Sequence, residues 1–308
     1  MKPLVVILLS DKRSGSTIFE KELCKHPKVK HVTYSSHTYF ETHHWLKAAC
    51  ILNTPKQLFY GHKMYKGYGS RTGARQYLID TIRGNVPNFI VPDNDESLVF
   101  EGWEALCRTF ATPIFFEKSP QYLSQWAALD LILKWMQCTE FDVRLIGLVR
   151  NPMAVMYSAQ KLFSTNPSER QFAWAQSYRN ILAMRDIVGY EQFHMVRYED
   201  LITQPKQTFR KVCEYLGIEL CEAIGEGVHA KSVALWRDDP TFTLQLHESV
   251  MRFAKHLGYG EEEMYNPPKP SLATYERIIG TTQKTMKLMM ARLYSRLIKP
   301  IFLTIQNK

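Results

Sequence analysis

The feature that most constrains the fold is a run of apolar residues followed directly by a turn of small polar residues. Residues 4–9 read LVVILL, and residues 10–17 read SDKRSGST. A continuous apolar run of this kind is typical of a strand that is buried on both faces. Ile18, Phe19 and Leu23 then follow at helical spacing. The sequence therefore predicts a strand, a tight loop and a helix, in that order.

The loop has the composition of an anion-binding site. Free N–H groups and the positive dipole end at a helix N-terminus attract phosphate or sulfate. Gly15 allows a ligand to approach the backbone, and Arg13 supplies a forked cation. Ser14, Ser16 and Thr17 add hydroxyl donors. We therefore predict that this loop holds a phosphate or a sulfate.

Three further apolar segments predict strands, at residues 113–118, 143–149 and 193–198. The helices expected between them indicate a parallel sheet that is covered on both faces. Functional side chains gather at the carboxyl ends of such strands. The polar groups that follow these segments are Glu117–Ser119, Arg150–Asn151 and Tyr198–Asp200. We predict an α/β fold with a central parallel sheet of four or five strands flanked by helices.

The remaining segments predict loops around the sheet and a helical C-terminal part. Residues 47–80 alternate short apolar pieces with Gly and Lys, which favours a loop. Residues 272–297 carry an apolar stripe, which is more often core packing than a membrane face. The Lys and Arg residues of this stretch leave weak contact with a membrane surface as a second interpretation. We predict a single domain over residues 1–308, with a helical extension over about 271–308.

Charge and cysteine usage indicate the partners and the compartment. The formal net charge of +9 favours anionic partners such as a nucleotide, a sulfated ligand, nucleic acid or a membrane surface. The six cysteines form no CxxC pair, as expected of free thiols in a reducing compartment. The first apolar run is too short for a signal peptide or a membrane span. We expect a cytoplasmic protein without a transmembrane segment.

The loop departs from the nucleoside-triphosphate loop GxxxxGK[ST] in two places. Ser10 stands in the place of the first Gly, and Ser16 stands in the place of the Lys. A kinase also needs carboxylates for magnesium. Asp95–Glu96 is the candidate for that role, because no predicted strand ends in a suitably placed Asp. A nucleotide or small-molecule kinase is therefore the alternative interpretation.

Four motifs together indicate a different anion. Residues 13–17, RSGST, closely resemble the 5′-phosphosulfate loop of the sulfotransferases that use 3′-phosphoadenosine 5′-phosphosulfate (PAPS). Arg150 and Ser158 are eight residues apart, like the pair that holds the 3′-phosphate in this family. Residues 197–201, RYEDL, resemble a segment whose Tyr packs near the adenine. Residues 116–122, FEKSPQY, resemble a motif of the carbohydrate-modifying branch. With similar stretches at 232–237 and 257–259, the resemblance extends from residue 10 to about 260.

This resemblance implies a P-loop-like sulfotransferase fold and an in-line transfer of the sulfuryl group from PAPS. The acceptor would be a hydroxyl or an amine of a small molecule or a glycan, and nucleic acid is not an expected partner. The product is 3′-phosphoadenosine 5′-phosphate (PAP), and no metal is required. The implied cofactor-binding residues are Arg13, Ser14, Gly15, Ser16, Thr17, Arg150, Ser158 and Tyr198. Arg13 and Lys118 would act at the reacting sulfuryl group. A sulfotransferase-like protein that binds the nucleotide without transfer is a second alternative.

The family motifs do not place the catalytic base uniquely. One branch uses the His of a K-T-H-x-P motif, and Pro120 stands in that place here. Other branches use a Glu further beyond the loop. Glu41, 28 residues after Arg13, is therefore the first candidate, followed by His37 and His43.

A zinc site is a further interpretation of this segment. His37, His43 and His44 lie close in the sequence. They lack a fourth ligand at the usual spacing for a structural zinc site. We therefore expect no metal, and the sequence does not indicate the oligomeric state.

Overall fold

The computed structural model describes residues 2–37, 39–52, 70–229 and 234–267, together with Met286, Met289 and Met290. These residues form a five-stranded sheet in the order β2-β3-β1-β4-β5, and every strand pair is parallel. The strands are β1 (Leu4–Ser10), β2 (Val29–Lys30), β3 (Ile114–Lys118), β4 (Asp142–Val149) and β5 (Phe193–Arg197). The predicted α/β fold with a central parallel sheet is confirmed.

The apolar run that opens the chain is the central strand of this sheet. All seven residues of β1 are buried, because the strand pairs with β3 on one side and β4 on the other. Successive side chains point to opposite faces of a strand. Val5, Ile7 and Leu9 accordingly belong to one hydrophobic cluster, and Leu4, Val6 and Leu8 belong to the other. A strand with alternating apolar and polar residues would have placed apolar side chains in only one of these two clusters.

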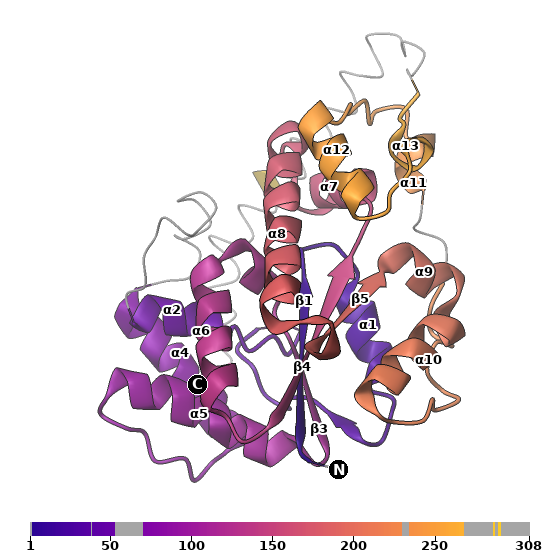
Figure 1. Cartoon of the computed structure of the whole chain (residues 1–308). Helices are drawn as coiled ribbons and strands as arrows, with labels where there is room; N and C mark the ends of the chain where they lie inside the picture. Colours follow the sequence, from indigo (N-terminus) through magenta and orange to yellow (C-terminus); the bar gives the residue numbers. More distant parts are fainter. Residues whose placement is uncertain are drawn as a thin grey trace.

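Helices cover both faces of the sheet (Figure 1). One face carries α1 (Ser16–Leu23), α9 (Tyr198–Thr203) and α10 (Pro205–Leu216). The other face carries α2 (His44–Ile51), α4 (Arg71–Asn85), α5 (Asp95–Phe110), α6 (Trp126–Cys138), α7 (Pro152–Phe163) and α8 (Pro167–Val188). The shorter elements are η2 (Pro120–Ser124), η3 (Tyr190–Gln192), α11 (Leu235–Asp238), α12 (Glu248–His256) and α13 (Glu261–Met264). Helices α7, α11, α12 and α13 lie toward the carboxyl ends of the strands (Figure 1).

The prediction of a loop over residues 47–80 is wrong for its two ends. Residues up to Ile51 complete α2, and α4 begins at Arg71. In α4, Ser70 caps the helix by accepting a hydrogen bond from the N–H of Gly73, and Leu78 and Ile82 are buried. The apolar positions of this stretch are spaced for a helix, although its Gly and Arg residues obscure the pattern. Residues 53–69 lie outside the described part of the chain.

Two other predictions concern the C-terminal part and strand β5. Most of the predicted extension over 271–308 lies outside the described residues, as do residues 232 and 233 of the motif at 232–237. Met286, Met289 and Met290 are helical and exposed. Strand β5 ends at Arg197, one residue earlier than predicted, because Tyr198 already begins α9. Within the described residues, each helix is either too short or too polar to cross a membrane.

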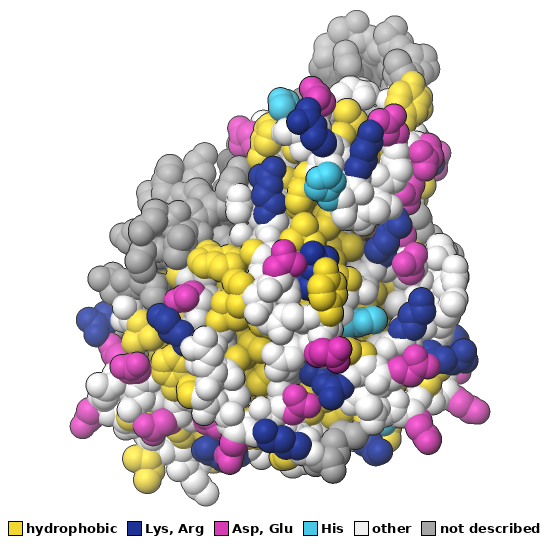
Figure 2. All heavy atoms as spheres, viewed as in Figure 1, with side chains coloured by type: hydrophobic (Ala, Val, Ile, Leu, Met, Phe, Trp, Pro, Cys, Tyr) yellow, Lys and Arg dark blue, Asp and Glu magenta, His cyan; other side chains and the backbone are white. Residues whose placement is uncertain are grey.

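The positive charge is spread over the visible surface. On the face shown in Figure 2, Lys and Arg side chains alternate with Asp and Glu side chains. A nucleic-acid footprint instead needs cationic side chains gathered along one stripe or patch. Although the net charge is +9, the cationic side chains on this face are not gathered into such a stripe or patch.

Candidate active site

The loop between β1 and α1 has two residues in the left-handed region of the backbone. Arg13 has φ 71° and Gly15 has φ 93°. A Cβ at Gly15 would lie 2.2 Å from the ring of Tyr198, so a side chain there would meet the ring as well as the unfavourable φ. This close approach requires Gly15, and it brings the start of α9 against the loop.

A cavity of about 620 Å³ opens beside this loop, at the carboxyl ends of β1, β4 and β5. Seven of the eight predicted cofactor residues line it: Arg13, Gly15, Ser16, Thr17, Arg150, Ser158 and Tyr198. Their segments lie far apart in the sequence and meet only because the strands that carry them are neighbours in the sheet. The structure therefore brings together the residues that the motifs indicated separately.

Two arginines meet at one side of this cavity. Nε of Arg13 donates to Oγ of Ser158 at 3.0 Å, and Nη1 of Arg150 donates to the carbonyl oxygen of Arg13 at 2.9 Å. The guanidinium of Arg150 also lies 4.1 Å from the ring centroid of Tyr198. Burial and the nearby charge of Arg150 lower the pKa of Arg13. Two cations this close repel each other in the free protein. An anion bound between them relieves this repulsion and is held by both.

The eighth predicted residue, Ser14, has a different environment. Its side chain is fully buried, and its Oγ lies 2.6 Å from Oη of Tyr178 on α8. The same Oη accepts the backbone N–H of Arg150 at 3.2 Å. Tyr178 therefore connects the loop after β1 with the end of β4. Ser14 contributes to the shape of the loop rather than to the lining of the cavity.

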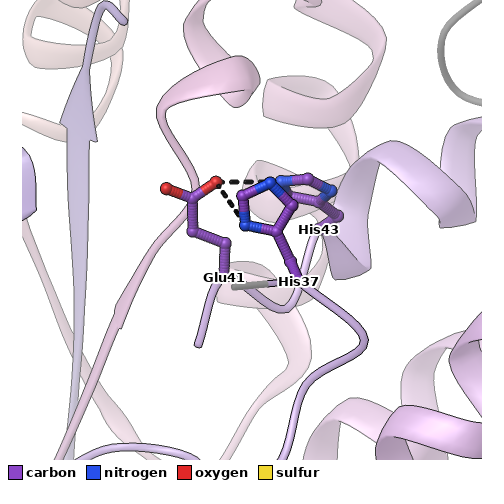
Figure 3. A group of neighbouring side chains, drawn as sticks. All are labelled: His37, Glu41 and His43. Carbon is purple, nitrogen blue, oxygen red and sulfur yellow. Dashed lines mark hydrogen bonds and ion pairs between the residues drawn. The ribbon is translucent and has the colours of Figure 1, made fainter. Parts of the chain in front are cut away.

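A second group of polar side chains lies at the carboxyl end of β3. Glu41 occupies its centre, with Oε1 3.0 Å from Nζ of Lys118. Its other oxygen, Oε2, lies 3.0 Å from Nε2 of His43 and 3.3 Å from Nδ1 of His37. Figure 3 shows both imidazole rings turned toward this one carboxylate. Nζ of Lys118 is also 3.4 Å from Oε2 of Glu20, and its side chain is fully buried.

The charges in this group act strongly on one another. Burial works against ionisation of Glu41, but the hydrogen bond with His43 and the charge of Lys118 outweigh it and lower its pKa to about 2. Burial raises the pKa of Glu20 to about 7, although Lys118 acts in the opposite direction. Burial is also the main cause that lowers the pKa of His37. At neutral pH, Glu41 is therefore a carboxylate held between a lysine and two histidines.

Hydrogen bonds to the end of β3 hold the segment that carries Glu41. The Thr42 hydroxyl donates to Oε1 of Glu117 at 2.8 Å, and the N–H of His43 donates to Oγ of Ser119 at 3.0 Å. Ser119 and Tyr122 also donate to the same Glu117 oxygen. Burial raises the pKa of Glu117 to about 7, which these three hydroxyl groups counter.

The two groups adjoin each other across the β1–β3 pair. Leu8 pairs with Lys118 in the sheet, so the loop after β1 emerges beside the end of β3. The ring centroid of Tyr39 lies 5.5 Å from Nζ of Lys118, and the Tyr39 phenol raises the pKa of Arg13 against the effect of burial. The charge of Glu41 likewise opposes the burial that lowers the pKa of Lys12 in the loop. A ligand at Arg13 would therefore lie near Lys118 and Glu41.

The model of the sulfotransferase family matches residues 3–222, which is most of the chain. The chain belongs to the sulfotransferase family. A search of curated proteins found no match.

Solved structures share its fold. The sulfotransferase domain of the olefin synthase from Synechococcus PCC 7002 is 22% identical and superposes with a TM-score of 0.55. That match covers 83% of this chain and 95% of the other. The sulfotransferase domain from the curacin biosynthetic pathway is also 22% identical, with a TM-score of 0.52 and coverage of 84% and 98%. At this identity the likeness shows a shared fold.

The five candidate catalytic residues of this sulfotransferase fall in the two adjoining groups. Arg13 is in the loop, and Lys118, Glu41, His37 and His43 are in the group at the end of β3. His44 is not among them. Its Nε2 lies 2.8 Å from the carbonyl oxygen of Val99, and its ring is buried beside Trp103. The zinc set that included His44 is therefore not formed.

Two residues of the site, Glu20 and Tyr178, were not indicated by the sequence, and Glu117 was indicated only as part of the polar group that ends a strand. Glu20 faces Lys118 from α1, Glu117 anchors the segment around Thr42, and Tyr178 joins the loop to β4. Glu20 lies in the amphipathic stretch that follows the loop, next to Phe19 on its apolar side. A charged residue at that position was the available signal. Tyr178 lies on α8 among apolar residues, and its hydroxyl gave no sequence signal.

Proposed function

We propose that this sulfotransferase transfers the sulfuryl group of PAPS to a hydroxyl or an amine of a small-molecule or glycan acceptor. The observation that supports this most is the position of the cationic cavity, which lies beside the buried Lys118–Glu41 pair. A cavity of this kind alone would support nucleotide binding. The adjoining carboxylate adds a group that can accept a proton.

The residues that line the cavity fit a 3′-phosphorylated adenine nucleotide. Arg150 and Ser158 would hold the 3′-phosphate, and Tyr198 would lie beside the adenine. The N–H groups at the start of α1 and the guanidinium of Arg13 would hold the 5′-phosphosulfate. PAPS, when bound, supplies the sulfuryl group and leaves as PAP.

Arg13 and Lys118 would stabilise the negative charge that builds on the leaving oxygen. Both are cations close to the loop, and a buried cation acts more strongly than one in water. The hydrogen bond between Arg13 and Ser158 places this guanidinium beside the residues proposed to hold the 3′-phosphate. No metal is needed for this stabilisation.

Glu41 would accept the proton of the acceptor. Its low pKa depends on the charge of Lys118 as well as on His43. When Lys118 turns to the sulfuryl group, the Glu41 carboxylate loses that contact, and burial then raises its pKa. The base would therefore become stronger at the moment when the donor is in place. His37 and His43 would orient Glu41, and each is an alternative base.

The acceptor would lie where its reacting atom reaches both the Glu41 carboxylate and the sulfuryl group, because in-line transfer needs both contacts. Tyr39 and Phe40 precede Glu41 in the chain and are about half exposed, at 53% and 45%. Aromatic rings of this kind suit the flat face of a ring system or a sugar. Residues 34–75 and 237–270 are rich in aromatic residues and histidines, and they would wall the acceptor pocket. Residues 53–69 of the first segment lie outside the described part of the chain.

We also infer a cytoplasmic location. All six cysteines are free, and three of them are buried. Free thiols are typical of proteins in a reducing compartment.

A binding measurement followed by a transfer assay tests the function. We expect PAP to raise the melting temperature of the protein, and AMP to raise it much less because AMP lacks the 3′-phosphate. Arg150→Ala should weaken PAP binding by about 10- to 100-fold, the range for a hydrogen bond to a charged group. Arg210→Ala, on the exposed side of α10, is the matched control and should bind normally.

Acceptors would then be screened with labelled PAPS. Transfer to any hydroxyl or amine supports the proposal. PAP binding with no transfer over a broad acceptor set would favour the non-catalytic alternative. Magnesium-dependent turnover of ATP without PAP binding would establish the kinase alternative instead.

A further inference from the structure

Three metal-binding atoms converge on one point at the end of β3. Nδ1 of His37, Oε2 of Glu41 and Nε2 of His43 all lie within 4.8 Å of one another. Figure 3 shows the three side chains meeting around the Glu41 carboxylate. Each atom comes from the same short segment, so their arrangement depends on the path of its backbone.

The backbone of this segment is tightly folded. Phe40 and His43 both have left-handed backbone angles, with φ 55° and 49°. Non-glycine residues adopt this region rarely, and they do so mostly where the surrounding structure enforces it. The Ser35 hydroxyl donates to the carbonyl of Glu41 at 2.6 Å and accepts the N–H of His37 at 3.0 Å. The three donor atoms are therefore held in place before any ligand arrives.

The chemistry of the donor set suits a borderline transition metal. Two imidazole nitrogens and one carboxylate oxygen are the ligands of many zinc sites that keep an open fourth position. Nδ1 of His37 is buried and has no hydrogen-bond partner, although it lies 3.3 Å from Glu41. The side chain of His37 is 34% exposed, so an ion can reach the group from solvent.

The other oxygen of the Glu41 carboxylate, Oε1, is bound by a residue that is not part of the three-residue group. Lys118 donates to Oε1 at 3.0 Å, which leaves Oε2 for the two histidines. Outer hydrogen bonds of this kind orient the ligating carboxylate in metal sites. The ammonium of Lys118 also repels a second cation, and Glu20, 3.4 Å away, offsets part of this repulsion.

We propose that His37, Glu41 and His43 form a site for Zn²⁺ or a similar divalent transition metal, and that the bound ion blocks sulfuryl transfer. A metal on Oε2 withdraws electron density from the Glu41 carboxylate. Oε1 is then a poorer proton acceptor, even after Lys118 turns to the sulfuryl group. The site itself stands on geometry alone, whereas its inhibitory effect rests on the proposed function.

The site is tested with Co²⁺, which absorbs visible light when it is bound by imidazole and carboxylate ligands. We expect one equivalent of CoCl₂ to give a visible band with the metal-free protein, and ZnCl₂ to displace it. His37→Ala removes a direct ligand, so it should weaken Co²⁺ binding by at least about 100-fold, the upper end of the cost of losing a mere outer-shell partner. His37 is partly exposed, so this variant is expected to fold. Loss of the band in His43→Ala would support the site further.

His256→Ala is the matched control, because His256 is an exposed histidine at the end of α12. It should bind Co²⁺ like the unmodified protein. Absence of the band, or a band that persists in His37→Ala, would overturn the metal site. Loss of the band in His256→Ala would also overturn the metal site at His37, Glu41 and His43.

The inhibitory effect is measured separately in the transfer assay. ZnCl₂ should abolish transfer over the concentration range in which it displaces Co²⁺, and EDTA should restore it. Transfer that continues with the site saturated would overturn the inhibition while leaving the site intact. If no acceptor is found at all, the proposed function fails, and the Co²⁺ spectrum still decides whether the site exists.

Discussion

Nζ of Lys118 lies 3.0 Å from Oε1 of Glu41, and the lysine side chain is fully buried. The two residues are 77 positions apart in the chain. Lys118 ends a strand next to β1, whereas Glu41 lies on the segment that leads into α2. The pair therefore joins the sheet to the segment that carries the histidines, beside the loop that contains Arg13.

Glu41→Gln should remove the base without removing nucleotide binding. Glutamine has a similar shape and accepts hydrogen bonds, but it cannot take up the proton of an acceptor. We expect kcat to fall by about a hundredfold to ten-thousandfold, the usual contribution of a general base. The affinity for PAP, measured by titration calorimetry, should stay within about twofold, since Glu41 does not line the cavity. Unchanged turnover at saturating acceptor would remove Glu41 from the mechanism.

Lys118→Met should destabilise the protein, because it leaves Glu41 and Glu20 buried without their common cation. Removing one partner of a buried ion pair costs about 3–5 kcal/mol. We expect a loss at the lower end of this range in urea unfolding at pH 7, because Glu20 can take up a proton. The double variant Lys118→Met/Glu41→Gln should recover part of the loss. If the two changes are simply additive, the pair makes no net contribution.

Tyr178→Phe tests the connection between the loop and β4. Without the hydroxyl, Oγ of Ser14 and the N–H of Arg150 each lose a buried partner. We expect a loss of about 1–3 kcal/mol in unfolding free energy. The affinity for PAP should fall by about tenfold, which corresponds to 1.4 kcal/mol.

Tyr190→Phe is the control for this change, because Tyr190 is 73% exposed. It should alter neither quantity. A Tyr178→Phe protein that is less stable but binds PAP normally would show that the connection is structural only.

Glu117→Gln should change the dependence of stability on pH. Burial raises the pKa of Glu117 from 4.5 to about 7, so the folded state holds this proton more tightly than the unfolded chain does. The stabilising contribution is complete below pH 4.5 and is lost as the pH rises through 7. A pKa shift of this size corresponds to a change of about 3 kcal/mol in the unfolding free energy between low and high pH.

We therefore expect the unfolding free energy to decline between pH 5 and 8, and to decline less steeply in Glu117→Gln. Urea unfolding at several pH values measures both slopes. Equal slopes in the two proteins would show that Glu117 does not titrate in this range.

Local sequence patterns were sufficient for the fold class and for the path of the loop after β1. The run from Leu4 to Leu9 is apolar at every position because β1 is buried on both faces, and this pattern is readable without a structure. Short motifs likewise indicated Arg13, Gly15 and Ser158, and the structure places all three on one cavity. The loop residues could be proposed from local geometry, because a loop at a helix N-terminus attracts anions, whereas Ser158 was indicated by the family resemblance. The first residues of α4 were not found, because Gly and Arg residues obscure its apolar positions.

The tertiary structure decided which polar residues act together. Glu41 was one of three candidate bases in the sequence, and the fold places it between Lys118 and two histidines. His44 has the same side chain as His43 and is its neighbour in the chain, yet its ring faces the core. Burial and the approach of distant charges depend on which strands and helices are neighbours. Spacing along the chain therefore determined the loop after β1, and only the packing of β3 against β1 determined which residues gather around Glu41.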